Sequence, residues 1–320
     1  MSNKKLSFVI PCYGSEKTII SVIEEIVNTV QHNNPYEIIC VNDCSPDGVD
    51  SVLKDLAENN KNIKILNLAK NFGQHNALMA GYRHVTGDII ISLDDDGQTP
   101  AKDCYKLINA LDDNTDVIYA KYPEKKHSLF KNFGSKMATW MGRVLIEVPA
   151  NLYLSSYFVC KRYVIDEIVK YENPYSYLCG LIVRTTKKIA NVDIEHRARK
   201  VGTTGYTFSK LISLWLNGFT AFSVKPLRIA TIIGLICSVF GFAYGTWIVI
   251  EKLFTNSTAP MGYSSTMAAI LFIGGMIMLM LGLIGEYIGR IYISINNSPQ
   301  YVIRERINCN QQNKEEKVDE

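Results

Sequence analysis

Hydrophobic and polar positions follow one pattern in the first two thirds of the chain and another in the last third. Before about residue 200, short apolar and β-branched runs alternate with segments whose apolar residues recur at helical spacing. The runs predict strands at 6–11, 37–42, 63–68, 89–93 and 117–120, and the segments between them predict helices at 16–31, 49–59, 74–85 and 101–111. Elements in this order predict an α/β fold in which helices cover both faces of a mostly parallel sheet.

The last third carries two long uncharged stretches, from 229 to 250 and from 255 to 285. Each is long enough for the ~20 helical residues that cross a bilayer core. We therefore predict two transmembrane helices, at about 229–250 and 264–286. The alternative, a pair of buried core helices, is less compatible with such lengths without charge.

Lysine and arginine residues flank both outer ends of this predicted hairpin, whereas the loop between its helices offers only Glu251 and Lys252. By the positive-inside rule, both termini are expected in the cytosol, on a multi-pass protein of the cell inner (cytoplasmic) membrane. No signal peptide is expected, because the first five residues lead directly into a strand-like run.

The expected parts are a soluble domain at 1–204, an interfacial amphipathic segment at 205–228, the transmembrane hairpin at 229–290 and a cytosolic tail at 291–320. Within the interfacial segment, aromatic and aliphatic residues surround a few polar ones, a composition that suits helices lying on the inner leaflet. The predicted protein therefore contacts the bilayer between about 205 and 290.

Charge and cysteine content argue against two other classes of protein. The net charge of +3, with 20% charged residues, does not favour a nucleic-acid partner. The eight cysteines show no C-x-x-C spacing, so neither a disulfide framework nor a zinc site is expected. Glycines four residues apart at 241–245 and 285–289 would let helices pack closely, which permits a homo-oligomer.

Polar, turn-forming sequence follows four of the predicted strands, at 11–16, 42–48, 71–73 and 94–97. The carboxyl ends of parallel strands meet at one edge of a sheet, so these loops should converge on one ligand site. The last of them holds the adjacent carboxylates Asp94, Asp95 and Asp96. A solvated acidic loop is the ordinary alternative, but at a strand end this run favours Mg²⁺ or Mn²⁺ bridged to a phosphate.

Several blocks of sequence together resemble a known family. They are PCYGSE, VNDCSPDG, NFGQHNALMAGYRHVTGD and LDDDGQTP, followed by two spans that end in GLIGEYIGRIY. This combination, over about residues 6–303, resembles the polyprenyl-phosphate glycosyltransferases of glycosyltransferase family 2. Within that group it is most similar to the undecaprenyl-phosphate 4-deoxy-4-formamido-L-arabinose transferases and the bactoprenol glucosyltransferases, and more distantly to dolichol-phosphate mannose synthase.

The resemblance implies a GT-A domain that transfers a sugar, with inversion, from a nucleotide-sugar to undecaprenyl phosphate in the bilayer, for cell-envelope glycan or lipid modification. UDP is the expected nucleotide, and Mg²⁺ or Mn²⁺ the expected cofactor. The implied nucleotide-sugar-binding residues are Pro11, Tyr13, Glu16, Asp43, Asp94, Asp95 and Gln98. The implied metal ligands are Asp96 and Asp94, and the implied acceptor-phosphate residues are Arg199, Lys200, Thr204 and Tyr206. Asp96, Asp94 and Arg199 form the expected catalytic set.

The chemistry of such a transfer agrees with these roles. A cation that neutralises the leaving diphosphate lowers the barrier without a strong acid. The acceptor phosphate is already an anion, so no Ser/His/Asp arrangement is needed. It does need a positive side chain near the membrane surface, which Arg199 and Lys200 would supply.

Some positions depart from the family's pattern. Gly14 stands where the family often has Asn, Asn42 where it often has Asp, and Gly97 where Leu usually follows the acidic motif. Ser155 is read as the replacement of an acidic residue, which would affect sugar specificity, and Gly205 replaces a frequent Lys.

Other readings of the sequence remain. A processive polysaccharide synthase should carry a Gln-x-x-Arg-Trp signature, and no tryptophan here follows such a run. A non-catalytic membrane scaffold that keeps a sugar-nucleotide fold is the other alternative, against which the intact Asp94 and Asp96 argue. His75 and His84 have no second histidine at metal-ligand spacing and are expected to be structural.

Overall fold

The computed structural model describes residues 4–122, 152–174, 176–194, 262–296 and 298–309, together with scattered positions between 232 and 254. The chain divides into two compact units. One unit comprises Met1–Phe208 with Ser298–Glu320, and the other comprises Ser209–Asn297.

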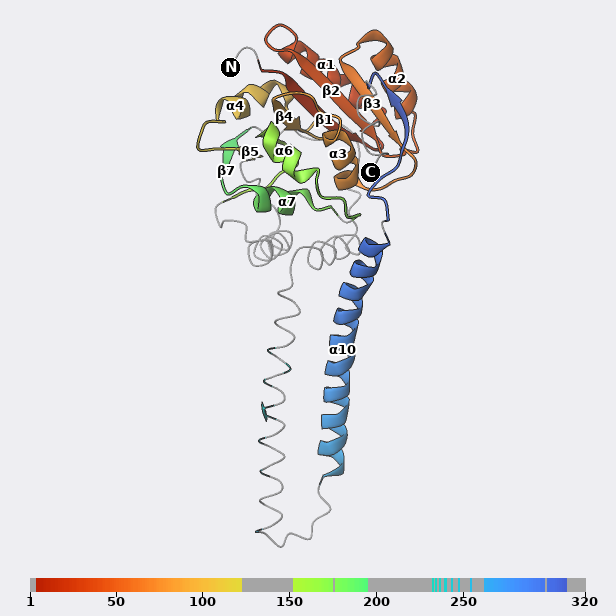
Figure 1. Ribbon diagram of the computed structural model, residues 1–320, viewed down its shortest axis with the longest axis vertical. Helices are drawn as coiled ribbons and strands as arrows, with labels where there is room; N and C mark the ends of the chain where they lie inside the picture. The colour runs from red at the N-terminus through yellow and green to blue at the C-terminus, as the bar shows by residue number, and fades with distance from the viewer. Residues whose placement is uncertain are drawn as a thin grey trace, which may run out of the picture. The chain divides into compact units, whose positions relative to one another are not determined.

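The first unit is built on an eight-stranded sheet with the strand order β7-β5-β6-β4-β1-β2-β3-β8 (Figure 1). The strands are β1 (Leu6–Cys12), β2 (Tyr36–Asn42), β3 (Ile63–Leu68), β4 (Ile89–Ser92), β5 (Val117–Lys121), β6 (Phe158–Lys161), β7 (Ile189–Asp193) and β8 (Ile303–Ile307). The four central strands β4, β1, β2 and β3 are parallel, as are β5 and β7, whereas β6 and β8 run antiparallel to their neighbours. The predicted α/β fold with a mostly parallel sheet is confirmed.

Helices cover both faces of this sheet. They are α1 (Ile19–Val30), α2 (Val49–Asn59), α3 (Gln74–Tyr82), the short 3₁₀ helix η1 (Ala101–Asp103), α4 (Cys104–Asn109), α6 (Arg162–Ile168) and α7 (Leu178–Thr185). The apolar faces of α1, α2 and α4 pack on one face of the sheet, in a cluster with Phe8 and Ile38. On the other face, α3 approaches so closely that a Cβ at Gly81 would lie 2.4 Å from Val9.

The predicted strands and helices coincide with observed ones, and the differences lie at helix ends. Helix α1 begins at Ile19 rather than at Glu16, because the amide groups of Thr18 and Ile19 close a turn on the carbonyl of Ser15. The predicted helix 101–111 is divided into η1 and α4. Three short strands, β6, β7 and β8, were not predicted.

Strand β8 corrects the expectation for the C-terminal segment. The sequence predicts a tail from 291 onward, but Ile303–Ile307 pairs antiparallel with β3 at the edge of the sheet, where the blue strand lies in Figure 1. Asn308 extends the contact by donating to the carbonyls of Ala57 and Ile63, at 2.7 and 2.9 Å. Ile303–Ile307 is therefore part of the sheet of the first unit.

Glu37 on β2 carries a buried negative charge, with its side chain only 2% exposed. It accepts hydrogen bonds from Lys64 Nζ at 2.7 Å and from the amide of Thr86 at 2.6 Å, and also from Ser7 Oγ. Burial alone would raise the pKa of Glu37, but these hydrogen bonds outweigh it and lower the pKa to about 2. The ionised carboxylate thus ties β2 to β1, β3 and the segment before β4.

The second unit contains the long helix α10, Tyr263–Ile295, whose 33 residues span about 50 Å. Among the described residues, it holds the one stretch long and apolar enough to cross a membrane, Phe272–Ile293. The second predicted span, 264–286, lies within this helix. The first predicted span, 229–250, is described only at scattered positions, so the number of spans stays a prediction.

Candidate active site

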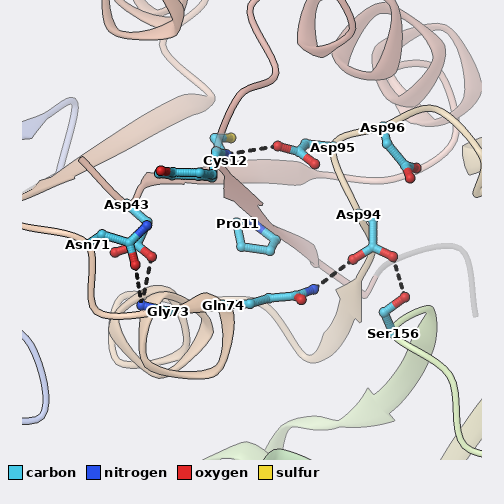
Figure 2. A pocket seen from close by; sticks show the side chains of 11 residues that line it. Pro11, Cys12, Asp43, Asn71, Gly73, Gln74, Asp94, Asp95, Asp96 and Ser156 are labelled. Carbon is cyan, nitrogen blue, oxygen red and sulfur yellow. Dashed lines mark hydrogen bonds between the residues drawn. The ribbon is translucent and has the colours of Figure 1, made fainter. Parts of the chain in front are cut away.

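A cavity of about 510 Å³ opens at the carboxyl ends of the central parallel strands (Figure 2). Strands β1, β2 and β3 end at about the same height in the sheet, because Cys12 pairs with Asn42 and Asn42 pairs with Asn67. The loops that follow these strands therefore lie side by side. The cavity is lined by Pro11, Cys12, Tyr13, Asp43, Asn71, Gly73, Gln74, Asp94, Asp95, Asp96 and Ser156. The four polar loops expected to converge do contribute to one cavity.

The end of β1 and the loop after it form one wall. Tyr13 is 54% exposed at the cavity, and its amide donates to Asp95 Oδ2 at 3.0 Å. Gly14 has a φ of +71°, in the left-handed region that glycine and asparagine tolerate better than other residues. The replacement of the family's Asn by Gly14 therefore preserves the turn that presents Tyr13.

Asp43 organises the loop between β3 and α3, which also lines the cavity. Its buried carboxylate accepts from the amides of Phe72 at 2.7 Å and Gly73 at 2.8 Å. Burial raises the pKa of Asp43, although these two hydrogen bonds act in the other direction. The interaction fixes Gly73, whose φ of +86° lets the chain turn directly into α3 at Gln74.

Asp94 lies between two side chains from other elements, as Figure 2 shows. Gln74 Nε2 donates to Asp94 Oδ1 at 2.8 Å, and the Ser156 hydroxyl donates to Asp94 Oδ2. Gln74 is the first residue of α3 and Ser156 precedes β6, so the orientation of Asp94 depends on two elements that are distant from it in sequence.

The other two carboxylates of the triplet point in different directions. Burial, together with the charges of Asp94 and Asp96, raises the pKa of Asp95 to about 6 in spite of the hydrogen bond that it accepts from the amide of Tyr13. Asp96 accepts from both the backbone and the side-chain amide of Gln98. Gly97, with a φ of +71°, forms the turn between them, and the Leu expected there would adopt this conformation only with strain.

Four carboxylates, those of Asp43 and the triplet, line this single cavity. An anionic ligand such as a diphosphate would be repelled unless a cation accompanied it. Among the residues that the structure describes, no three His, Cys, Asp or Glu side chains are grouped to hold a metal ion by themselves. Carboxylate oxygens are ligands that Mg²⁺ and Mn²⁺ prefer, and a bound phosphate commonly supplies further ligands to these ions.

The residues predicted for the site fall into three groups. Six of them line the cavity, namely Pro11, Tyr13, Asp43, Asp94, Asp95 and Asp96. Glu16 and Gln98 are not among the lining residues: Glu16 accepts from the amide of Gly48 in a neighbouring loop, and Gln98 donates to Asp96 within its own loop. The predicted acceptor residues Arg199, Lys200, Thr204 and Tyr206, and also Gly205, lie outside the described residues.

Sequence reasoning assigned no site role to Gln74 or Ser156. Gln74 directly follows the turn-forming Asn71-Phe72-Gly73, and its place at a strand end was the available signal. In the segment where an acidic residue was expected, the serine that reaches the cavity is Ser156. Ser155 instead donates its hydroxyl to the carbonyl of Tyr157 at 2.8 Å. The two histidines are not among the residues that line the cavity: His75 packs edge-on against Tyr177, and His84 Nδ1 lies 2.8 Å from the carbonyl oxygen of Ala80.

Comparison with protein families assigns both halves of the chain. The model of glycosyl transferase family 2 matches residues 7–166. This range includes β2 to β6, nearly all of β1 and every residue that lines the cavity. The chain belongs to glycosyl transferase family 2. A second model, the GtrB C-terminal hairpin, matches residues 225–291, so this glycosyltransferase shares its apolar C-terminal region with a defined group of relatives.

Full-length relatives of this glycosyltransferase bear out the more specific resemblance. An undecaprenyl-phosphate 4-deoxy-4-formamido-L-arabinose transferase of Photorhabdus laumondii is 31% identical, over 97% of this chain and 96% of the relative. A prophage-derived bactoprenol glucosyl transferase of Shigella flexneri is 31% identical, over 94% of this chain and 97% of the relative. An uncharacterized glycosyltransferase of Synechocystis is 32% identical, over 93% and 94% of the two chains.

Among solved structures, glucosyl-3-phosphoglycerate synthase from Mycobacterium tuberculosis, crystallised with Mn²⁺, UDP and its product, has a similar fold. The TM-score is 0.50 with 17% sequence identity, over 72% of this chain and 79% of the other. This likeness supports the α/β fold of the glycosyltransferase domain.

Proposed function

We propose that this glycosyltransferase transfers a sugar from a nucleotide-sugar to undecaprenyl phosphate, with inversion at the sugar's anomeric carbon. The expected donor is a UDP-sugar. The observation that carries the proposal is the cavity at the ends of β1 to β4, lined by Asp43 and the triplet Asp94–Asp96. The relatives named as bactoprenol and undecaprenyl-phosphate sugar transferases, which match over nearly their whole length, support the choice of acceptor.

The donor's nucleoside would lie on the side of Tyr13 and Asp43, and its diphosphate near the acidic triplet. The exposed ring of Tyr13 offers a flat face for a base, and Asp43 is a buried acceptor for base or ribose donors. A donor in this orientation places the sugar beyond the diphosphate, toward Ser156.

Asp96 and Asp94 would hold a divalent cation between the protein and the donor diphosphate. When bound, the ion supplies positive charge to the leaving diphosphate. Asp94 is kept in one orientation by Gln74 and Ser156, so it needs little rearrangement to accept such an ion.

The reaction itself needs one bond formed and one broken. An oxygen of the lipid phosphate attacks the anomeric carbon, and the bond from that carbon to the β-phosphate oxygen breaks, releasing the nucleoside diphosphate. The attacking phosphate is already ionised, so no protein base has to remove a proton. Arg199 and Lys200 are proposed to bring this anion to the cavity from the inner leaflet.

The enzyme is further proposed to lie in the cytoplasmic membrane, with a transmembrane hairpin and with both termini and the glycosyltransferase domain in the cytosol. Helix α10 and the match to the C-terminal hairpin model support the membrane placement. The lysine and arginine flanks of the apolar region support the orientation.

The proposal is tested by incubating the purified full chain in nanodiscs with undecaprenyl phosphate and a panel of nucleotide-sugars, with Mn²⁺ or Mg²⁺ present. We expect a lipid-phosphate sugar, identified by mass spectrometry, with one donor strongly preferred. A matched preparation of Asp96→Asn measures the background. Donor binding without any transfer or hydrolysis, over the whole panel, would favour the non-catalytic scaffold instead.

A further inference from the structure

A continuous series of hydrogen bonds runs from the C-terminal strand to the loop after β2. Asn67, at the end of β3, is completely buried. Its amide nitrogen donates to Glu305 Oε2 on β8 at 2.8 Å and to Asp50 Oδ1 at 2.7 Å. Its carbonyl oxygen accepts from the side-chain nitrogen of Asn42 at 3.0 Å. All the hydrogen-bonding groups of the Asn67 amide are therefore satisfied.

The series continues from Asn42 into the loop 43–48. The side-chain oxygen of Asn42 accepts from the amide of Ser45 at 3.0 Å. Ser45 Oγ accepts from the amide of Gly14 at 2.8 Å and donates to Asp47 Oδ1 at 2.6 Å. The series thus ends at the two loops that carry Tyr13 and Asp43 into the cavity.

We propose that Glu305 is a positioning residue for the nucleotide-binding loop 43–48, and that it acts through Asn67 and Asn42. The proposal rests on the proposed function only in naming a nucleotide as the ligand of this loop. It makes the chain segment that follows α10 a part of the donor site, although that segment lies outside the stretch matched by the family 2 model.

The negative charges of two carboxylates determine which residue donates and which accepts in this series of hydrogen bonds. Two carboxylates, Asp50 and Glu305, face the same end of Asn67, so that end must be the NH₂ group. The opposite end is then a carbonyl, and its neighbour at position 42 must be a donor. Asn42 can donate, whereas the Asp expected at this position could not. Asn42, Asn67 and Glu305 are therefore a matched set, which explains why the chain departs from the family's pattern at Asn42.

The same contacts stabilise the ionised form of Glu305. The hydrogen bond from Asn67 lowers the pKa of Glu305, and the ion pair with Lys54 Nζ at 3.0 Å adds to this effect. Removing the carboxylate leaves one hydrogen of a fully buried amide without its acceptor, so that Asp50 alone holds the NH₂ group of Asn67 and the contact with Asn42 is weakened. Loop 43–48 would then lose the hydrogen bond at Ser45.

The experiment compares Glu305→Ala with three other variants of the full chain in nanodiscs. Glu305→Gln keeps an acceptor oxygen for Asn67 without the charge. Lys54→Ala removes the ion pairs of Lys54 with Glu305 and Asp50 but keeps both carboxylates that face Asn67. Arg304→Gln changes an exposed neighbour on the same strand. Hydrogen exchange of peptides covering 43–48 reports the loop, and donor KM and kcat report the site. Thermal unfolding identifies any variant that fails to fold.

For Glu305→Ala we expect faster exchange in 43–48 and a donor KM raised about 3- to 10-fold, with kcat within about 2-fold of the unmodified enzyme. Glu305→Gln should recover most of the loss, and Lys54→Ala and Arg304→Gln should behave like the unmodified enzyme. Equal exchange and equal KM in Glu305→Ala and Arg304→Gln would overturn the inference, as would a Lys54→Ala variant that reproduces the defect. If the unmodified enzyme uses no nucleotide-sugar, the proposed function fails, and loop exchange alone then decides the role of Glu305.

Discussion

The orientation of Asp94 offers a direct test of how the cavity is prepared for catalysis. Its carboxylate is held by Gln74 on one oxygen and by Ser156 on the other. A hydrogen bond to a charged group contributes about 1.5–3 kcal/mol, and Asp94 is half-buried, so we take the lower value. About 1.4 kcal/mol corresponds to a tenfold change in rate. Ser156→Ala should therefore lower kcat/KM for the donor about tenfold, and Gln74→Ala by a similar factor.

The two losses should not add. Both bonds serve a single orientation, so a carboxylate freed by the first substitution has little left to lose with the second. We expect the double variant to be about 10- to 30-fold impaired, rather than the ~100-fold of independent effects. Initial rates of transfer to undecaprenyl phosphate, measured over a range of donor concentrations, give the three values needed.

The chain supplies a matched control for this test. Ser155→Ala makes the same chemical change one residue earlier, but its hydroxyl bonds to Tyr157 and does not reach Asp94. Ser155→Ala should be nearly neutral, and Ser156→Thr, which keeps a hydroxyl, should recover part of the activity. If Ser155→Ala and Ser156→Ala were equally active, or if the double variant lost the full product of the single effects, this account of Asp94 would be refuted.

Three further outcomes are expected. Asp96→Ala should lose at least ~10²-fold in turnover, because the leaving diphosphate is no longer neutralised, and activity that persists both in this variant and in EDTA would contradict the metal role. Arg199→Ala should mainly raise the KM for undecaprenyl phosphate while nucleotide affinity, measured by calorimetry, stays constant; an unchanged acceptor KM would remove Arg199 from the acceptor site. Glu37 has a folded-state pKa of about 2, below its ordinary value of 4.5, so it stabilises the fold by about 3 kcal/mol above pH 4.5 and loses this as the pH falls toward 2. Glu37→Gln should unfold more readily at pH 7 and show a weaker dependence of stability on pH in that window, and an unchanged denaturant midpoint would speak against this.

The central strands were predictable because their signals are local. β1 to β4 are apolar on both faces, as parallel strands covered by two layers of helices must be, and each ends in a turn-forming loop. The position of the candidate site followed from the same rule, since the carboxyl ends of parallel strands share one edge. The triplet Asp94–Asp96 could be placed at that edge without any knowledge of its partners.

Strands β6, β7 and β8 were not predictable in this way. β8 has only Ile303 and Ile307 as apolar residues, with charged ones between them, because an edge strand is buried on one side at most. Its partner β3 lies far away in sequence, since Asn67 and Glu305 are separated by 238 positions. β6 has four residues and runs antiparallel beside β4. The two strands are not joined by a short turn, so the sequence does not predict their pairing. Pairings of this kind are set by packing of the whole domain.

The same limit applies to the residues that surround the acidic triplet. A sequence shows which side chains can hold a charge, but the partner that fixes each one comes from a distant element, as Gln74 and Ser156 do for Asp94. Asn42 illustrates the consequence most clearly. In the sequence it is a departure from the family's pattern that is read as tolerated. In the fold it is the donor required by Asn67, whose own orientation is dictated by Glu305 near the end of the chain. A family position that changes from Asp to Asn should therefore be accompanied by a carboxylate on the edge strand, and an Asn42→Asp substitution made here alone should disturb the donor loop even though it restores the commoner residue.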